Sequence, residues 1–478
     1  MRKYILKYPF GFFILLAAAL RFFSFFPSVI DHDESTYLQI GKELLDGKKY
    51  FIDVIDVKPP GIFYVTAVIQ AVFGDSIFLF RLLCSVLIAF TSFLLFRLKF
   101  KLSGSSEEAV AAGVLYILML SVYTYYGISA NTELFTNLLA VSALLLFVSG
   151  LKGSYFFAGL LLGIGFIIKH SVVFDYLAFG SFFLFSSITS KKITGSYLLQ
   201  LLSSFAAFIL PFLLVVFYYY SLGRLNTYLF YTFRVPAAYP VERETGDTLL
   251  FVLDFLLRFF PFSFFFFIVL FKGKVFFNGY NFKALMITWC CFVLFAVLYS
   301  GQSFGHYFIQ IYPPFVLLAS GFFNRDFHPY PFISKIKKTP VITGLLILIC
   351  GTIIFFQKKD YYDKPDMPLQ ISRFLKKEMM AEDLIYVHGY HQIVYYLVDK
   401  PSLNKYVHRS ILFNNKLIDA MDIDTDEVAG EIIKANPRFI VECEEAYFGK
   451  LEQYKDDHYQ LVKTFTNNKP VKIYKRRD

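Results

Sequence analysis

Long apolar segments recur through the first 357 residues of the chain, with short polar connections between them. Hydrophobic residues make up 56% of the sequence and charged residues 18%, whereas a soluble domain carries about 25% charge. A helix that crosses a bilayer needs about 20 mostly apolar residues. The chain is therefore predicted to be a multi-span α-helical membrane protein, whose many Phe and Tyr residues contact lipid and the membrane interfaces.

Eleven transmembrane segments are expected from the apolar pattern. They cover residues 10–30, 76–98, 107–125, 133–150, 154–170, 171–189, 196–220, 248–271, 284–300, 305–322 and 340–356. The apolar run 61–73 is too short to cross and is expected to lie along the membrane surface. It belongs to an outward loop, residues 31–75, that carries interfacial helices.

The loops between these segments alternate in charge. One set holds sixteen Lys and Arg residues and only the acids Glu107, Glu108 and Asp326, so this set is predicted to be cytoplasmic. The N-terminus is then cytoplasmic, and an odd number of spans places the C-terminus outside. The basic residues of these loops also explain the net charge of +10, so this charge does not indicate a nucleic-acid partner. The five cysteines have no CxxC or paired spacing, so neither a metal knuckle nor a disulfide framework is indicated.

The composition changes at residue 358 to that of a soluble domain. We expect two domains: residues 1–357, which form the transmembrane catalytic part, and residues 358–478, which form an extracytoplasmic α/β domain. The pattern predicts helices at 369–380 and 428–435, strands at 383–387 and 438–442, and a further apolar stretch at 393–397.

Three carboxylates stand within four positions directly after the first apolar segment: Asp31, Asp33 and Glu34. One of them can cap the amphipathic helix that follows, but a cap does not need three acids. Like charges this close raise the pKa of one group, which prepares a general base. From the sequence alone, a capping role and a catalytic role for these acids are about equally supported. Lys58 precedes two prolines that restrict the backbone, so it is either an exposed loop lysine or a point charge held for a phosphate.

Other polar residues lie at the outward ends of their segments. Arg81 and Lys169 either mark a functional site or extend their side chains to the interface. Glu133 complements a helix dipole, and a lone His306 is more often structural than a ligand. The aromatic outward loop 222–247 also contains Arg234 and Arg243, which could border a substrate groove.

The shared outward position of these residues indicates their chemistry. Nucleotide sugars are not supplied outside the cytoplasm, so a transferase there uses a donor already carried across on a lipid. Such an enzyme needs cations for a lipid phosphate and a carboxylate base for an acceptor hydroxyl.

The sequence Asp33-Glu34, followed by Lys58-Pro59-Pro60-Gly61 and by Arg81 early in the second span, resembles the GT-C polyprenyl-phosphate-dependent glycosyltransferases. That superfamily includes protein O-mannosyltransferases and bacterial lipid A aminoarabinose transferases. Residues 1–320 are similar to it, and the first 100 residues carry the specific part.

The resemblance implies an inverting sugar transfer. It implies that Asp33 is the base or orients the acceptor, that Glu34 supports it, and that Lys58 contacts the carrier phosphate with help from Arg81. Glu133 and His306 would orient the substrate or hold a divalent metal cation. In the aminoarabinose transferases an acid precedes Lys-Pro-Pro. This chain departs from that pattern, because Val57 stands directly before Lys58 and Asp56 lies one residue earlier.

The predicted protein is a glycosyltransferase of the bacterial inner membrane. Its partners are membrane lipid, a polyprenyl-phosphate sugar donor and an extracytoplasmic lipid, glycan or protein acceptor. The predicted substrate-binding residues are Lys58, Arg81, Glu133, Lys169, His306 and Arg234. The alternative is a transporter or flippase of lipid-linked saccharides, which would place charges at the bilayer midplane and repeat its two halves; neither feature is visible in the sequence.

Overall fold

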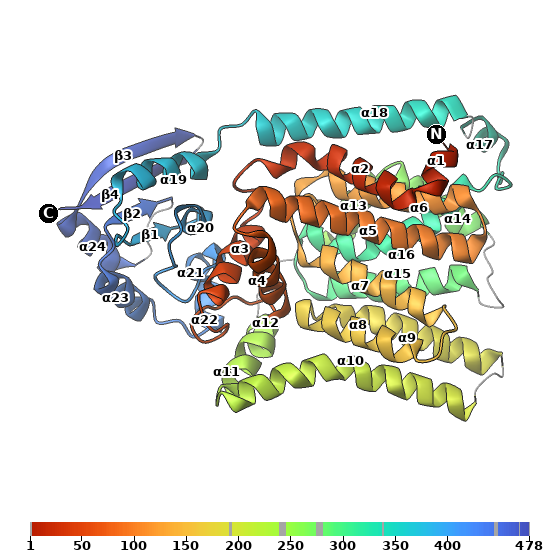
Figure 1. The fold of residues 1–478 in the computed structure, drawn as a ribbon, viewed down its shortest axis with the longest axis horizontal. Helices are drawn as coiled ribbons and strands as arrows, with labels where there is room; N and C mark the ends of the chain where they lie inside the picture. The colour runs from red at the N-terminus through yellow and green to blue at the C-terminus, as the bar shows by residue number, and fades with distance from the viewer. Residues whose placement is uncertain are drawn as a thin grey trace. The chain divides into compact units, whose positions relative to one another are not determined.

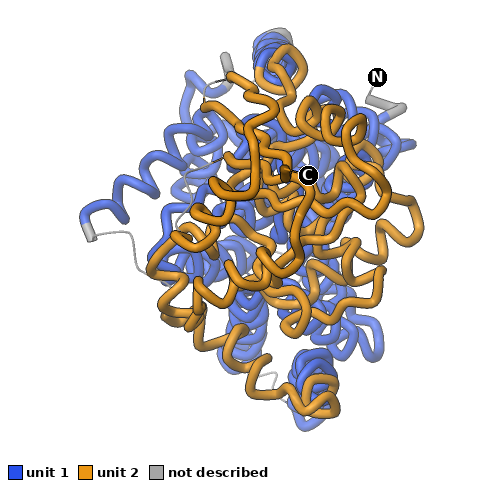
Figure 2. Tube along the Cα trace, turned by 90° about the vertical axis from the view of Figure 1, so that its left-hand side faces the viewer, with its two compact units in different colours: residues 1–25, 81–217, 241–359 blue, residues 26–80, 218–240, 360–478 orange. Residues whose placement is uncertain are grey.

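The computed structural model describes residues 2–190, 194–238, 245–273, 281–336, 339–443, 448–467 and 469–477. Contacts divide the chain into two compact units that alternate along the sequence (Figure 2). Unit 1 comprises Met1–Phe25, Arg81–Phe217 and Val241–Lys359. Unit 2 comprises Phe26–Phe80, Tyr218–Pro240 and Asp360–Asp478. The tail therefore shares a compact unit with the first outward loop, while the domain division at residues 357 and 358 stays a prediction.

Unit 1 is helical (Figure 1). Its helices, two of which run on into unit 2, are α1 Arg2–Lys7, α2 Pro9–Arg21, η1 Phe22–Phe25, α5 Ile77–Ser103, α6 Ser106–Val122, η2 Thr124–Tyr126, α7 Thr132–Phe147, α8 Ser154–Ile168, α9 Val172–Thr189, α10 Gly195–Ser221, α13 Thr245–Arg258, α14 Phe262–Lys272, α15 Phe282–Tyr299, η4 Gly305–Ile311, α16 Tyr312–Ala319, η5 Ser320–Phe323, α17 Pro331–Ile336 and α18 Thr339–Gln357.

Among the described residues, five helices are long and apolar enough to cross a membrane, or six if the bent pair α13 and α14 counts as one span. Shorter apolar helices accompany them, at Pro9–Phe25, Thr132–Phe147 and Ser154–Ile168 in unit 1. The prediction of a multi-span helical membrane protein is confirmed.

Three of the segments expected to be single spans are not one continuous helix over the expected range. The segment 248–271 is bent by 103° between α13 and α14, where Pro261 lacks an amide hydrogen and disfavours helix at the residue before it. The segment 305–322 changes from a 3₁₀-helix to α16 at Tyr312, because two prolines occupy the first turn. The first span is shorter than expected, since α2 ends at Arg21.

Lys99 follows the predicted span 76–98 and is one of the sixteen basic residues assigned to cytoplasmic loops, but it lies inside α5 and is buried. Its Nζ lies 2.7 Å from Oε2 of the buried Glu108 and donates to the carbonyl oxygen of Leu317 at 2.9 Å. Both charges are paired because an unpaired charge in the interior of a helix bundle is costly. The sidedness of the loops stays a prediction.

Unit 2 combines helices with a small sheet. Its elements are α3 His32–Leu45, α4 Gly61–Phe73, α11 Leu225–Leu229, the π-helix η3 Phe230–Arg234, α12 Val235–Ala238, the π-helix η6 Lys358–Tyr362 at its edge, α19 Met367–Glu378, β1 Ile385–His388, α20 Ile393–Val398, α21 Arg409–Phe413, α22 Asn415–Ala420, α23 Thr425–Ala435, β2 Phe439–Glu442, α24 Gly449–His458, β3 Tyr459–Asn467 and β4 Lys469–Arg476.

The sheet has the order β1-β2-β4-β3, with β1 and β2 parallel and the other pairs antiparallel. Ile371 and Leu375 of α19 pack in one apolar cluster with Ile385, Phe439 and Ile473. The predicted α/β character of the tail is confirmed, as are both helices and both strands within a few residues. The apolar stretch 393–397 is helix α20, and the hairpin β3–β4 was not predicted.

Helix α3 is joined to the tail by a buried carboxylate. Glu43 accepts hydrogen bonds from the backbone amide of Ser402 at 2.7 Å and from Nε2 of Gln39 at 2.8 Å, and pairs with Lys48 at 3.0 Å. The bond from Ser402 connects segments 359 residues apart and helps to explain why the loop and the tail form one unit.

Replacing Glu43 with Ala is expected to destabilise unit 2 by about 2–3 kcal/mol, because a buried amide and a lysine lose their acceptor. Chemical unfolding of the full-length protein in detergent would measure this. Glu431→Ala, at an exposed position of α23, is the matched control. Equal stability of the two variants would contradict the prediction.

Candidate functional site

Asp33 and Lys58 are brought together in unit 2. Asp31 is the N-cap of α3 and accepts from the amide of Asp33 at 3.0 Å, which places Asp33 in the first turn. Lys58 stands two residues before Pro60, the residue at which the backbone turns into α4. The two side chains meet with Nζ of Lys58 2.9 Å from Oδ1 of Asp33.

The backbone around Lys58 is held by its neighbours. The amide of Lys58 donates to Oδ1 of the buried Asp56 at 3.0 Å, and the hydroxyl of Tyr50 donates to the carbonyl oxygen of Lys58 at 2.7 Å. The ammonium lies 5.5 Å from the ring centroid of Tyr37 and 3.8 Å from Asp56. Lys58 is therefore a positioned cation, and about a fifth of its side chain (22%) remains exposed to an incoming ligand.

The structure adds a residue that the sequence analysis missed. His408 is the N-cap residue of α21, and its Nε2 lies 3.2 Å from Oδ1 of Asp33. The backbone amide of Ser410 donates to Nδ1 of His408 at 3.2 Å. Because an N–H group donates only to an unprotonated nitrogen, we assign the imidazole proton to Nε2, which donates to Asp33. An adjacent ammonium and this N–H group both favour the ionised carboxylate.

The spacing of 375 residues explains why sequence analysis missed this contact. A single histidine in a tail has no pattern that connects it with an acid near the N-terminus.

Glu34 and Arg81 are both buried, with 1% of each residue exposed. Glu34 follows Asp33 in the first turn of α3 in unit 2. Arg81 lies in the first turns of α5 and belongs to unit 1, where its Nη1 donates to the carbonyl oxygen of Ser24 at 3.0 Å. Glu34 was expected to support Asp33 as the base, and Arg81 to help Lys58 contact the carrier phosphate. Both roles stay predictions.

A second group of predicted residues meets in unit 1. Lys169, at the end of α8, forms an ion pair with the buried Glu133 in the first turn of α7. Its ammonium lies 4.2 Å from the ring centroid of Tyr307. His306 in η4 interacts electrostatically with Glu133. The structure thus brings together Glu133, Lys169 and His306, which the sequence placed on three different segments.

The loop 222–247 contains three arginines. Arg234 is exposed at the end of η3, and its expected role in substrate binding stays a prediction. Arg243 lies outside the described residues. Arg224, just before α11, lines a pocket with Lys405.

The part of the chain that the structure describes contains no group of three or more His, Cys, Asp or Glu side chains suited to a metal ion. Glu133 and His306 therefore form no such ligand set with described residues.

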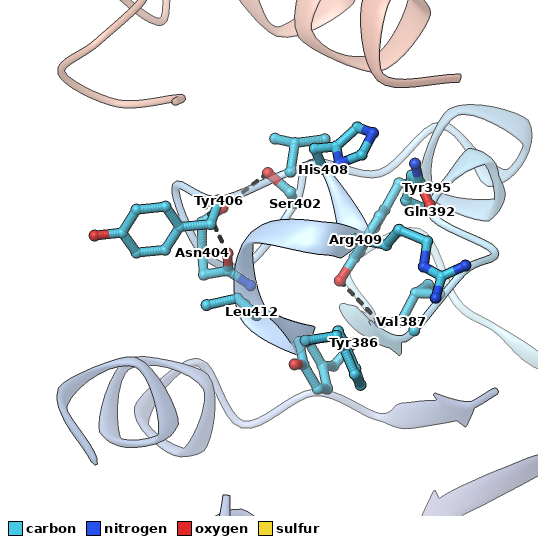
Figure 3. A pocket seen from close by; sticks show the side chains of 13 residues that line it. Tyr386, Val387, Gln392, Tyr395, Ser402, Asn404, Tyr406, His408, Arg409 and Leu412 are labelled. Carbon is cyan, nitrogen blue, oxygen red and sulfur yellow. Dashed lines mark hydrogen bonds between the residues drawn. The ribbon is translucent and has the colours of Figure 1, made fainter. Parts of the chain in front are cut away.

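The side chain of His408 also lines a small cavity in the tail (Figure 3). The cavity has a volume of about 20 Å³, room for about one water molecule. In Figure 3 the backbone amide of Val387 donates to the hydroxyl oxygen of Tyr395 at 2.8 Å. This cavity is too small for a sugar and is not a substrate site.

Two histidines near this site are half-buried and are held in the neutral form. Burial, together with His408 and Arg409, lowers the pKa of His32 from 6.5 to about 4. Burial likewise lowers the pKa of His391 to about 4, with Asp366 opposing the shift. Nδ1 of each ring is buried without a hydrogen-bond partner, so neither ring has an acceptor there to stabilise a second proton.

Residues 57–239 match the family model described as dolichyl-phosphate-mannose-protein mannosyltransferase. This stretch contains Lys58, Arg81, Glu133 and Lys169. The fold is similar to that in the crystal structure of ArnT from Cupriavidus metallidurans in the apo state, with a TM-score of 0.66 and 11% sequence identity over 97% of each chain. No curated protein matches the chain in sequence. The resemblance to the GT-C glycosyltransferases is thereby confirmed.

Unit 2 is expected to lose stability as the pH falls from 6.5 to 4. In this range the unfolded state protonates His32 and His391 while the folded state does not, so each contributes a loss of about 1 kcal/mol per pH unit. Above about pH 8 both rings are neutral in both states and contribute no slope. Unfolding of the full-length protein at pH 5 and pH 7 measures the difference.

The double variant His32→Gln/His391→Gln is expected to reduce this pH dependence. His458→Gln, at an exposed position of α24, is the control. If the double variant and the control showed the same dependence on pH as the unaltered protein, the assignment of neutral histidines would be wrong.

Proposed function

We propose that this multi-pass membrane protein is an inverting glycosyltransferase that moves a sugar from a polyprenyl-phosphate carrier to an extracytoplasmic acceptor. The observation that carries the proposal is the group formed by Asp33, Lys58 and His408, in which one carboxylate oxygen has a cation at 2.9 Å and an N–H donor at 3.2 Å. The matched family model and the fold support it.

The chemistry follows from the properties of these groups. Asp33 accepts the proton of an acceptor hydroxyl, whose oxygen attacks the anomeric carbon of the donor sugar. The bond from that carbon to the phosphate oxygen breaks on the opposite face, which inverts the configuration. The polyprenyl phosphate leaves with one more negative charge, which the ammonium of Lys58 stabilises.

Lys58 has two anionic partners in this scheme. In the structure its ammonium contacts Asp33, and a bound carrier phosphate competes for the same cation. Binding of the donor thus draws Lys58 towards the phosphate and frees a lone pair of Asp33 for the acceptor proton. His408 keeps the carboxylate in place during this exchange, so it is a positioning residue.

The remaining predicted residues take supporting roles in this proposal. Arg81 assists Lys58, Glu34 supports Asp33, and the group formed by Glu133, Lys169 and His306 orients the substrate. We place the enzyme in a bacterial inner membrane, with a cytoplasmic N-terminus and residues 358–478 on the outer side. The basic cytoplasmic loops support this orientation.

Asp33→Asn is expected to reduce sugar transfer by about 10²–10⁴-fold, because the amide cannot accept the proton. Lys58→Ala is expected to cost about 10²-fold or more through the leaving phosphate. Transfer from a radiolabelled polyprenyl-phosphate sugar to envelope acceptors, measured with purified protein, tests both.

Asp46→Asn, at the exposed end of α3, is the control and should retain full activity. Undiminished transfer by Asp33→Asn would remove Asp33 as the base. Movement of lipid-linked sugar across the bilayer without any transfer would instead favour the flippase.

His408→Ala is expected to lower kcat by about 10-fold or more with little change in KM, because Asp33 loses its N–H donor. It should also shift the acid limb of the pH–rate profile. His408→Gln should restore most of kcat, since its side-chain amide can donate from a similar place. Equal loss in Ala and Gln variants, with no change in the pH profile, would reduce His408 to a structural residue.

A further inference from the structure

A second pocket lies in unit 2, and its lining residues are separate from Asp33, Lys58 and His408. Its volume is about 190 Å³, which is smaller than the pockets of about 300–1,000 Å³ that hold drug-sized ligands. Three segments line it: the loop before α4, the start of α11 with η3, and the loop before α21. The residues are Phe51, Ile52, Ile55, Arg224, Thr227, Tyr231 and Lys405.

The apolar wall of this pocket is rigidly built. The amide of Phe51 donates to the carbonyl oxygen of Val54 at 2.8 Å, and the amide of Ile55 donates to that of Lys405 at 2.7 Å. The rings of Phe51 and Tyr231 are stacked, with centroids 5.7 Å apart and planes 11° apart. Phe51, Ile55 and Tyr231 are buried, with 1%, 2% and 8% exposed, so the wall fixes the shape of the pocket and presents little surface of its own.

Two backbone features at the wall are uncommon. Phe51 has a φ of 62°, a conformation that is costly for a bulky side chain and is retained where the surroundings enforce it. Tyr231 lies on the π-helix η3, a form often found at functional sites. Both features place an aromatic ring at the pocket.

The polar side of the pocket is cationic. Arg224 is exposed, Lys405 is half-buried, and neither forms an ion pair with the acids that the structure describes. The ammonium of Lys405 lies 5.2 Å from the ring centroid of Tyr406, and Thr227 adds a hydroxyl. Two cations on one small pocket repel each other, and an anion bound between them removes that repulsion.

We propose that this pocket binds a phosphate or carboxylate carried on a sugar or on a lipid headgroup. The cations bind the anionic group, while the stacked rings of Phe51 and Tyr231 hold the pocket in shape. The inference rests on the proposed function for the role of this ligand, which is the anionic acceptor or a membrane lipid beside it.

The test uses the full-length protein in phosphatidylcholine nanodiscs and radiolabelled glucose 1-phosphate in equilibrium dialysis. We expect saturable binding, and a dissociation constant at least about tenfold higher for Arg224→Ala/Lys405→Ala. The charge-preserving Arg224→Lys/Lys405→Arg variant should bind within a few-fold of the unaltered protein. Lys416→Ala/Lys434→Ala, which removes two exposed charges elsewhere in unit 2, is the matched control and should bind normally.

A second arm identifies the source of the anion. If a lipid headgroup fills the pocket, nanodiscs that contain phosphatidylglycerol should abolish glucose 1-phosphate binding by the unaltered protein. If the ligand is the acceptor, binding should persist in those nanodiscs. Either result supports an anion site.

Three results would overturn the inference: no saturable binding, equal binding by the Arg224→Ala/Lys405→Ala variant, or equally tight binding of uncharged glucose. Asp33→Asn should bind glucose 1-phosphate normally. A failure of the proposed transferase reaction would therefore leave this measurement unaffected, and the two proposals fail separately.

Discussion

The site in unit 2 depends on one carboxylate oxygen that accepts from two partners. Oδ1 of Asp33 lies 2.9 Å from the ammonium of Lys58 and 3.2 Å from Nε2 of His408. These partners are 25 and 375 residues away in the sequence. The contact is possible only because the first outward loop and the tail fold as one unit, with bonds such as those of Glu43 holding α3 against the tail.

In unit 1, buried charged side chains are satisfied by hydrogen bonds to neutral groups. Nη1 of Arg21 donates to the carbonyl oxygens of Leu120 and Gly127, at 2.6 and 2.9 Å, and so ties α2 to the end of α6. Asp175 accepts from Nε1 of Trp289 and from Nε2 of Gln310, both at 2.6 Å. Polar groups in apolar helices are expensive unless satisfied within the protein, so these contacts fix the helices relative to one another.

The two units contribute different groups of residues to the proposed reaction. Unit 2 holds the carboxylate, the cation and the histidine on the capped starts of α3 and α21 and on the turn into α4. Unit 1 holds its own ion pair between Glu133 and Lys169 at the ends of two apolar helices. Each group is built on helix ends, where backbone geometry is set by caps and prolines and the side chain is free to meet a ligand.

The sequence by itself determined the class of the protein and supplied candidate site residues in the segment 31–75. Hydropathy predicted the helical membrane part, short apolar runs predicted the strands β1 and β2, and the run of acids with Lys58 made these residues candidates, because each of these patterns depends on neighbouring residues. Tertiary structure decided that Asp33 meets Lys58 and His408, that Lys99 is buried with Glu108, and that Arg224 and Lys405 line one pocket. Those outcomes depend on contacts between distant segments, and the local pattern around a residue such as His408 carries no information about the partner that folding brings to it.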